Sequence, residues 1–357
     1  MRLSERRSPT LECAKLMTSG SFSRRQFVGR SVFGAGMAAV FRQSCPAVDS
    51  VVEIPKVPQP GYLQPITDPV FGSKVTRITG DPGDLIPNLD ARWDGVARHH
   101  YSKDAAWNCD QSLLCLGRHH GFPSMLFLDG STYEPLFGRN NSPGAEVRWH
   151  AKRPEVMVFV KGNQIGLWNV RKDETEIIET FAEYSDFHIG PWEGNLSLDS
   201  RMIVVNAKKR EEPVAFAYDL EAKQKWPDLS LAGMTVDWVS ASASGKFIIL
   251  NGQITEERGD QTQVYDLEGR KVGDLWPEYG RPSHYDLTLD ENGDDIAVGV
   301  SKSRPDDGRV IKRRLRDGRA TILTSGGYAG HASTRNVNRP GWAYATYQQR
   351  TKDWPPY

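Results

Sequence analysis

Residues 283–300 read SHYDLTLDENGDDIAVGV, and this stretch decides the predicted fold. A polar segment that carries His284 is followed by a turn rich in Asp, Asn and Gly, and then by the apolar segment Ile296–Val300. Two short extended segments on either side of such a turn are typical of a β-hairpin. Similar units recur along the chain, and most begin with a histidine or an aromatic residue, so we predict a protein built from repeated β-hairpins.

The turn residue before each apolar segment measures the repeat. These residues recur every 44 to 48 positions, at Asp110, Pro154, Asp199, Ser244, Asn292 and Pro340. A period in the mid-forties with strand signals alone is that of propeller blades. A second turn signal in each repeat, such as Phe127–Gly130, fits the hairpin between the third and fourth strands of a blade. The sequence therefore predicts an all-β protein, a β-propeller of four-stranded blades, rather than a β-sandwich, which needs no constant repeat.

The segments around the repeats set the expected domain boundaries. We assign residues 1–47 to a signal peptide, residues 48–65 to a linker rich in Pro and Gly, and residues 66–357 to the propeller. Residues 70–79 resemble a single outer strand, and fewer residues follow Pro340 than follow the earlier turns. We therefore expect a seven-bladed type that lacks its C-terminal blade, or a six-bladed ring in which residues 70–79 supply the last outer strand.

The N-terminal region carries the most specific short motif, SRRQFV at Ser23–Val28, followed by the weakly apolar run Ser31–Phe41. This resembles a bacterial twin-arginine export signal. A run of 11 residues is too short for a bilayer, which needs about 20. We expect a periplasmic or secreted protein that uses the twin-arginine export machinery and has no stable membrane insertion. Cys109 and Cys115 would remain in the mature chain, either as two core residues or as one hairpin disulfide.

Composition excludes one class of partner. The 357 residues include 45 basic and 45 acidic side chains, for a formal net charge of +0. Binding to phosphates needs a basic excess on at least one face, so nucleic acid is not expected as a partner.

Four histidines lie 8 to 11 residues before a turn residue: His100, His188, His284 and His331. The first strand of each propeller blade lines the central channel, so a ring would bring these histidines within reach of one another. A single histidine at such a position is more often a structural hydrogen-bonding group. Four at matched positions predict a site, although they could also satisfy one another and buried carbonyl groups.

Other side chains at channel positions suggest the ligand. They are Arg148, Trp149, Trp192, Tyr285 and Arg335. Arginine neutralises a carboxylate and tryptophan stacks on a sugar ring, so together with His188 they predict binding of an acidic oligosaccharide. A glycoside hydrolase would need two carboxylates that face each other, for which Asp237 and Asp286 are candidates.

Several short motifs resemble the oligogalacturonate lyases: Lys74–Thr79, Tyr101–Lys103, Asp110–Leu114, Ser283-His284 and Gly330-His331. The resemblance covers most of the chain after Pro65. It implies a seven-bladed propeller with a divalent metal, typically manganese, held by histidines of the last two blades. It also implies that His331 is a metal ligand and that His284 is the catalytic base. The family's remaining ligands come from a final blade, which this sequence stops before.

The chemistry that the resemblance implies is β-elimination on uronate-containing saccharides, with a base that removes the proton next to the carboxylate. A second arrangement uses His100, whose spacing from His120 resembles the histidine pair of ulvan lyases. The alternative is a non-catalytic propeller that binds a saccharide or a protein, since a fold alone does not decide function.

Overall fold

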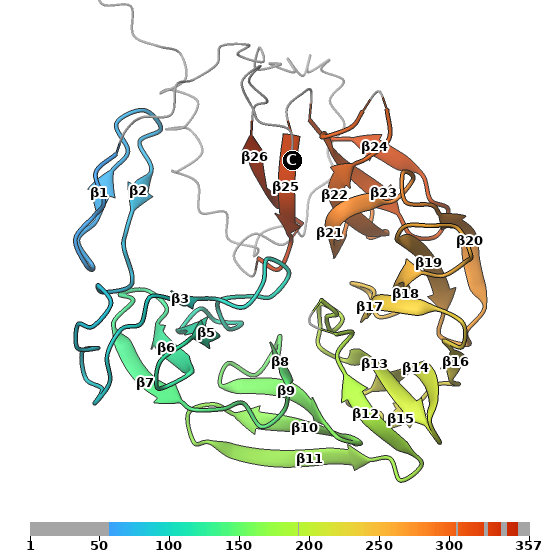
Figure 1. The fold of residues 1–357 in the computed structure, drawn as a ribbon, viewed down its shortest axis with the longest axis horizontal. Helices are drawn as coiled ribbons and strands as arrows, with labels where there is room; N and C mark the ends of the chain where they lie inside the picture. Colours follow the sequence, from blue (N-terminus) through green and yellow to red (C-terminus); the bar gives the residue numbers. More distant parts are fainter. Residues whose placement is uncertain (1–56, 192, 305, 325–327, 337–340, 349–357) are drawn as a thin grey trace, which may run out of the picture. The chain divides into compact units, whose positions relative to one another are not determined.

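The computed structural model describes residues 57–191, 193–304, 306–324, 328–336 and 341–348. These residues form β-strands, turns and loops, and no helix is present among them. Figure 1 shows the sheets set around a common centre, with β8, β12, β17, β21 and β25 innermost. The prediction of an all-β propeller is confirmed. No helix in the described part of the chain is long and apolar enough to cross a membrane.

Four of the sheets are complete blades of antiparallel strands, each starting with its innermost strand. The second blade contains β8 (Glu146–Trp149), β9 (Val156–Lys161), β10 (Gln164–Asn169) and β11 (Glu174–Thr180). The third contains β12 (Tyr184–His188), β13 (Met202–Lys209), β14 (Glu212–Asp219), β15 (Gln224–Lys225) and β16 (Leu229–Ser230). The fourth contains β17 (Thr235–Ala241), β18 (Phe247–Gln253), β19 (Gln261–Asp266) and β20 (Lys271–Trp276), and the fifth β21 (Pro282–Leu289), β22 (Asp295–Ser301), β23 (Val310–Arg314) and β24 (Ala320–Ile322).

The remaining sheets are smaller. The first blade pairs β4 (Leu113–Leu116), β6 (Met125–Asp129) and β7 (Pro135–Arg139), and beside it β3 (Ala97–Arg98) pairs with β5 (Arg118–His119). β25 (Tyr328–Ser333) pairs with β26 (Tyr344–Gln348). β1 (Ile66–Thr67) pairs with β2 (Lys74–Val75). The six-bladed closure through residues 70–79 is therefore wrong for the described strands, because β2 pairs with β1 and not with the last sheet.

The turns explain why the sequence period works. Gln111, Ser200, Gly245 and Gly293, each one residue after a predicted turn position, adopt positive φ angles of 61°, 57°, 77° and 78°. This reversal ends the innermost segment of a blade and starts its second strand. Later in each blade an Asp or Asn oxygen accepts hydrogen bonds from the next backbone amides, as Asp129 does from Ser131 and Thr132. The same contact is made by Asn169, Asp219 and Asp266. These contacts fix the outer hairpins.

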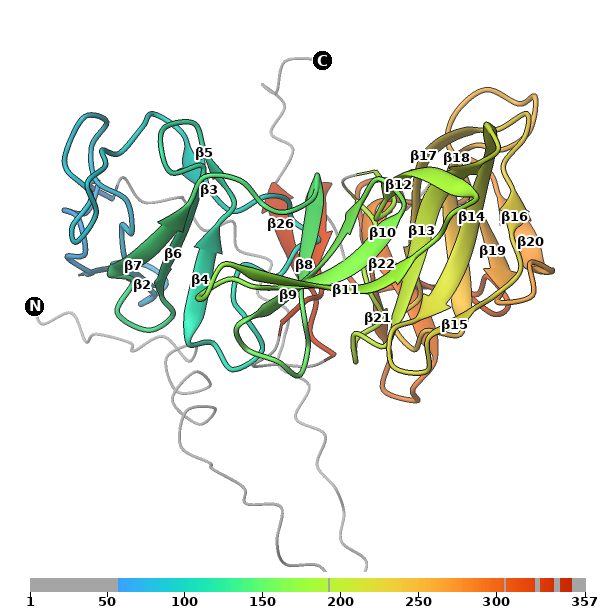
Figure 2. The ribbon, with the colours of Figure 1, turned by 90° about the horizontal axis from the view of Figure 1, so that it is seen from below.

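The hydrophobic core lies between neighbouring sheets. Val158 and Ile165 of the second blade pack with Ile203 and Phe216 of the third. Further clusters join the third blade to the fourth, the fourth to the fifth, and the fifth to β25 and β26. Both views agree that the third blade lies between the second and the fourth (Figures 1 and 2). Each blade therefore buries both of its faces, which is why its central strands are continuously apolar.

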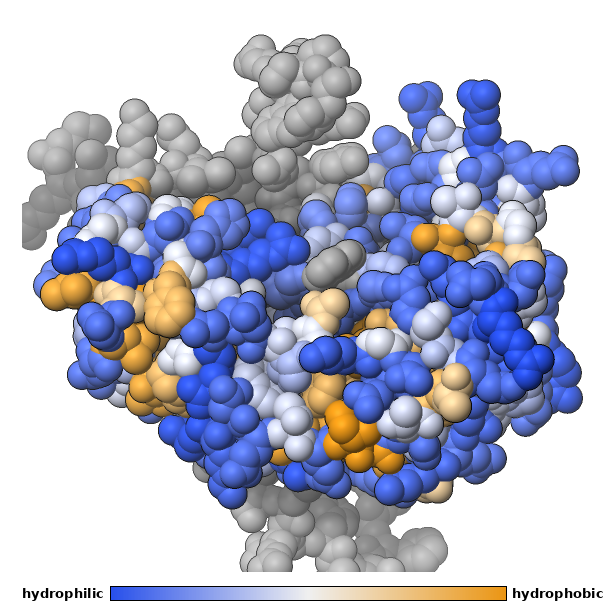
Figure 3. All heavy atoms as spheres, turned by 60° about the horizontal axis from the view of Figure 1, so that its bottom comes forward, coloured by the Kyte–Doolittle hydropathy of each residue, from blue (hydrophilic) through white to orange (hydrophobic). Residues whose placement is uncertain are grey.

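The predicted boundaries meet the structure in part. Residues 1–56, with the twin-arginine motif, lie outside the described residues. Within the predicted linker, Tyr62 packs edge-on against Trp93, with the ring centroids 5.9 Å apart. Cys109 and Cys115 are both free thiols, so the disulfide alternative is wrong. On the face shown in Figure 3, hydrophilic side chains predominate and hydrophobic ones gather in scattered patches.

Four innermost strands carry a β-bulge at the same point of the blade. The bulged residues are Asp186–Phe187 in β12, Asp237 in β17, His284–Tyr285 in β21 and Gly330–His331 in β25. A bulge inserts an extra residue and re-aims a side chain. In each of these strands the bulge holds a polar residue at the channel.

Candidate functional site

The bulge of β21 positions His284. Ser283 pairs with Val300 and Asp286 with Val298, so His284 and Tyr285 together face Gly299. A Cβ atom on Gly299 would lie 2.6 Å from the Ser283 carbonyl oxygen, so only glycine leaves room for the bulge. His284 adopts a φ of 47°, a strained conformation for a residue with a side chain. Its side chain lines a cavity of about 160 Å³.

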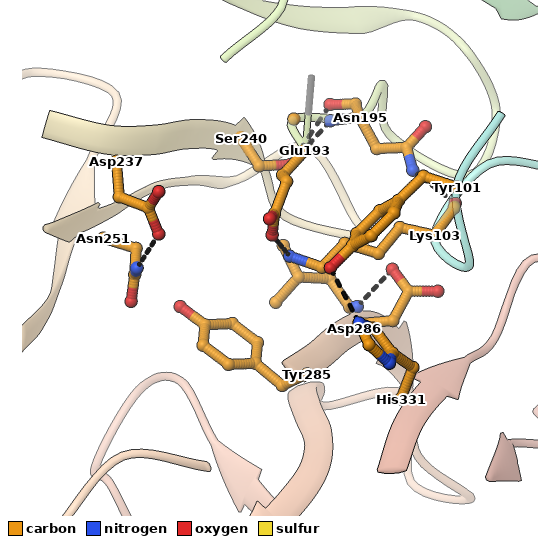
Figure 4. A network of polar contacts seen from close by, with 12 residues as sticks. Tyr101, Lys103, Glu193, Asn195, Asp237, Ser240, Asn251, Tyr285, Asp286 and His331 are labelled. Carbon is orange, nitrogen blue, oxygen red and sulfur yellow. Dashed lines mark hydrogen bonds and ion pairs between the residues drawn. The ribbon is translucent and has the colours of Figure 1, made fainter. Parts of the chain in front are cut away.

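Lys103 is the buried cation of this cavity. It comes from the loop before β4 and is 3% exposed. Its Nζ donates to Glu193 Oε2 over 2.7 Å and lies 3.9 Å from the centroid of the Trp238 ring (Figure 4). Burial lowers the pKa of Lys103, while the Glu193 carboxylate opposes that shift. A buried ammonium group with one carboxylate partner can also serve an incoming anion.

His284 is a candidate base. Burial lowers its pKa, and the neighbouring imidazole of His331 lowers it further. The two rings lie 4.2 Å apart between centroids. His331 is held by Tyr101, whose hydroxyl lies 3.0 Å from His331 Nε2 (Figure 4). His284 is therefore neutral at neutral pH, as a general base must be.

Asp237 is a candidate proton donor in the same cavity. Burial raises its pKa, and the carboxylates of Glu193 and Asp260 raise it further. Asn251 Nδ2 donates to Asp237 Oδ2 over 2.8 Å, and this holds the side chain in place (Figure 4). A neutral base, a buried cation and a carboxylic acid that retains its proton thus line one small space.

The residues do not fit the metal centre that the sequence resemblance implies. No group of three or more His, Cys, Asp and Glu side chains in the described ranges could hold a metal ion. His284 and His331 form a pair of imidazoles, and His331 already bonds to Tyr101. Two ligands fall short of the set that holds a transition metal in proteins. We therefore derive no step through a metal.

A second cavity of about 510 Å³ takes other predicted site residues: His100, Arg148, Trp149 and Arg335. No residue lines both cavities. His100 Nδ1 pairs with Asp104, and its Nε2 lies 3.2 Å from Arg118 Nη2. The structure therefore divides the predicted residues between two sites, and His100 does not share a cavity with His284.

Other predicted residues have structural contacts. His188 Nδ1 lies 3.1 Å from Glu146 Oε1. Tyr285 is 1% exposed, and its hydroxyl lies 3.0 Å from Thr262 Oγ1, so its ring forms a wall of the smaller cavity. Trp192 lies outside the described residues.

The hydrolase alternative fails at Asp286. This carboxylate is 2% exposed and accepts hydrogen bonds from the Leu287 amide and from the amide and hydroxyl of Thr334, at 2.7 to 2.8 Å. Asp286 joins β21 to the segment after β25 and does not face Asp237 as a free carboxylate.

The sequence reasoning missed Lys103 and Glu193 as functional residues. Lys103 appears in it only as part of a motif, because a lysine in a polar loop has no periodic signal. The two residues are 90 positions apart in the chain. The matched offset that singled out His188 applies also to Glu193, which follows the same strand.

Comparisons with known proteins identify no family. No protein-family model and no curated protein matches the chain. Among solved structures, it is similar to an oligogalacturonate lyase from Vibrio parahaemolyticus, with 12% identity, a TM-score of 0.46, and 77% of this chain and 75% of that one covered. It is also similar to an oligogalacturonate lyase in complex with manganese, with 13% identity, a TM-score of 0.35, and coverage of 73% and 83%.

A third similar structure is TolB from Acinetobacter baumannii, with 14% identity, a TM-score of 0.35 and 63% of this chain covered. The match spans about half of the TolB chain, 53%. Because these likenesses are distant, the functional argument depends on this chain's own residues.

Proposed function

We propose that this protein is a lyase that cleaves uronate-containing oligosaccharides by β-elimination. The observation that carries the proposal is the small cavity in which neutral His284 and the buried ammonium group of Lys103 meet. A base beside a buried cation suits removal of a proton next to a carboxylate, because the cation stabilises the charge that develops.

Each step has a residue. Lys103 binds the uronate carboxylate, and a His284 ring nitrogen takes the proton from the adjacent carbon, C5. The electron pair of that C–H bond forms the C4–C5 double bond and expels the glycosidic oxygen from C4. Asp237, whose pKa is raised by burial, gives its proton to the leaving oxygen. General-base catalysis supplies about 10² to 10⁴-fold, and charge stabilisation by Lys103 supplies a further factor.

Absorbance of the unsaturated uronate product tests the proposal. The protein is mixed with pectic, alginate and ulvan oligosaccharides, with manganese in one series and a chelator in another. Turnover that persists with the chelator and is lost in His284→Ala supports the metal-free step, and turnover that needs manganese contradicts it. A folded protein that binds a saccharide without turnover is instead a binding propeller, and this is the alternative function.

We also propose that the protein is exported to the periplasm or secreted. Support comes from the paired Arg24 and Arg25 before a short apolar run. Replacement of both arginines by lysine should keep the protein in the cytoplasm of a bacterial host, as fractionation would detect. Export of that variant at the wild-type level would contradict the proposed route.

A further inference from the structure

The 510 Å³ cavity is large enough for a small ligand and is independent of the proposed lyase site. It lies between the first and second blades, whose Met125 and Met157 line it. The loop that carries Leu196 and the segment that carries Arg335 complete the wall. Trp107 and Trp149 add aromatic surface. A lining of this kind favours an apolar, planar body over a sugar, whose hydroxyl groups would need many polar partners.

Two donors in this wall are buried and have no hydrogen-bond partner in the described residues: Trp149 Nε1 and Arg335 Nε. The guanidinium group of Arg335 is held from one side, where Nη2 donates to the Leu196 carbonyl oxygen over 2.9 Å. A buried donor without an acceptor costs about 1–3 kcal/mol. Such donors in a cavity wall point to an acceptor that a ligand supplies.

The charges around the cavity favour an anion. Its walls hold three arginines, Arg118, Arg148 and Arg335, and two carboxylates, Asp104 and Glu146. Both carboxylates are already engaged. Asp104 pairs with His100 and with Arg148, and Glu146 pairs with Arg148 and with His188. With the histidines uncharged, one positive charge is left over, and Arg335 is the arginine for which no carboxylate partner is found in the described residues.

We propose that this cavity is a second ligand site that binds an aromatic monocarboxylate. The carboxylate pairs with the Arg335 guanidinium and accepts from the Trp149 indole N–H. The aromatic ring packs among the tryptophan, methionine and leucine side chains of the wall. A carboxylate matches the planar donor geometry of arginine, and one negative charge matches the charge left over.

Calorimetric titration of the full chain with 2-naphthoate tests this proposal, with 2-naphthalenemethanol as the uncharged analogue. Naphthoate should bind, and the alcohol should bind about tenfold more weakly or worse. Arg335→Met should weaken naphthoate binding about 10- to 100-fold, since hydrogen bonds to charged groups are strong. Arg335→Lys should keep part of the affinity.

Two further variants keep the test decisive. Ala145 lines the cavity and is exposed, so Ala145→Phe should fold and should block binding. His284→Ala changes only the other cavity and should bind naphthoate as the wild type does. The proposal is overturned if folded wild type does not bind naphthoate at millimolar concentration, or if the alcohol binds equally well. Wild-type affinity in Ala145→Phe would overturn it even where Arg335→Met does not fold.

Discussion

Replacement of Lys103 by methionine is the sharpest test of the proposed chemistry. Methionine keeps the length of the apolar stem over the Trp238 ring and removes the ammonium group that lies 2.7 Å from Glu193. Loss of one preorganised charge that stabilises a transition state lowers kcat about 10² to 10³-fold. We expect Lys103→Met to reduce turnover of a uronate oligosaccharide by that factor.

The same structure limits the expected loss of stability. Removal of the ammonium group ends a desolvated cation–π contact, which contributes about 2 kcal/mol. The partner left behind, Glu193, has 29% of its side chain exposed, so water solvates the carboxylate that loses its cation. The free energy of unfolding should therefore fall by about 2 kcal/mol, and the variant should stay folded at room temperature.

Turnover is measured by ultraviolet absorbance of the product, and folding by denaturant titration of the same samples. Lys312→Met is the matched control, because Lys312 pairs with Glu291 on β23 and lines neither cavity. It should leave kcat unchanged. A folded Lys103→Met variant with kcat within about threefold of the wild type would refute the role of Lys103. Glu193→Gln should have the opposite effect on binding, with a lower KM, because it frees the ammonium group for the substrate.

Three further predictions concern pH and stability. His331→Phe should shift the acid limb of the kcat/KM profile to higher pH, because His331 lowers the pKa of His284; an unmoved limb would contradict that coupling. The pKa values of His150 and His284 are both lowered by burial, so both take up protons more readily in the unfolded chain. The free energy of unfolding should then be full above about pH 6.5 and fall below it, as denaturant titrations at pH 7 and 5 would detect; equal values would argue against buried neutral imidazoles. Asp286→Ala should lower the free energy of unfolding by about 3 kcal/mol, because it leaves buried donors unpaired, whereas the exposed Glu291→Ala should change it by less than about 1 kcal/mol.

The blade period was predictable because it depends on local chemistry. A turn needs a residue that tolerates positive φ, and Gly245 and Gly293 meet that need whatever the rest of the chain does. The apolar strands that follow are buried on both faces, so their composition shows their place in the blade. Even Gly299 in the apolar strand β22 had a meaning, since the bulge of β21 requires it.

The arrangement of the site was not predictable in the same way. An offset of 8 to 11 residues from a turn places a histidine near the channel but does not fix the direction of its side chain. A bulge adds one residue to a strand and turns the side chains beyond it to the other face. His284 and His331 lie in bulges, whereas His100 lies in a loop that joins a different cavity. Partners such as Lys103 and Glu193 meet only because the ring brings distant loops together.

The recurrence of the bulge separates what the fold imposes from what function adds. Four blades bulge at the same point, so the bulge belongs to the repeated scaffold. The residues in it differ: Asp186, Asp237, His284 and His331. A positive φ at His284 costs about 1–3 kcal/mol, which an asparagine or glycine would avoid in large part. A histidine that adopts this strained conformation at the mouth of a small polar cavity is poorly explained by stability, and this is the physical reason to expect the chemistry of this protein at the bulge of β21.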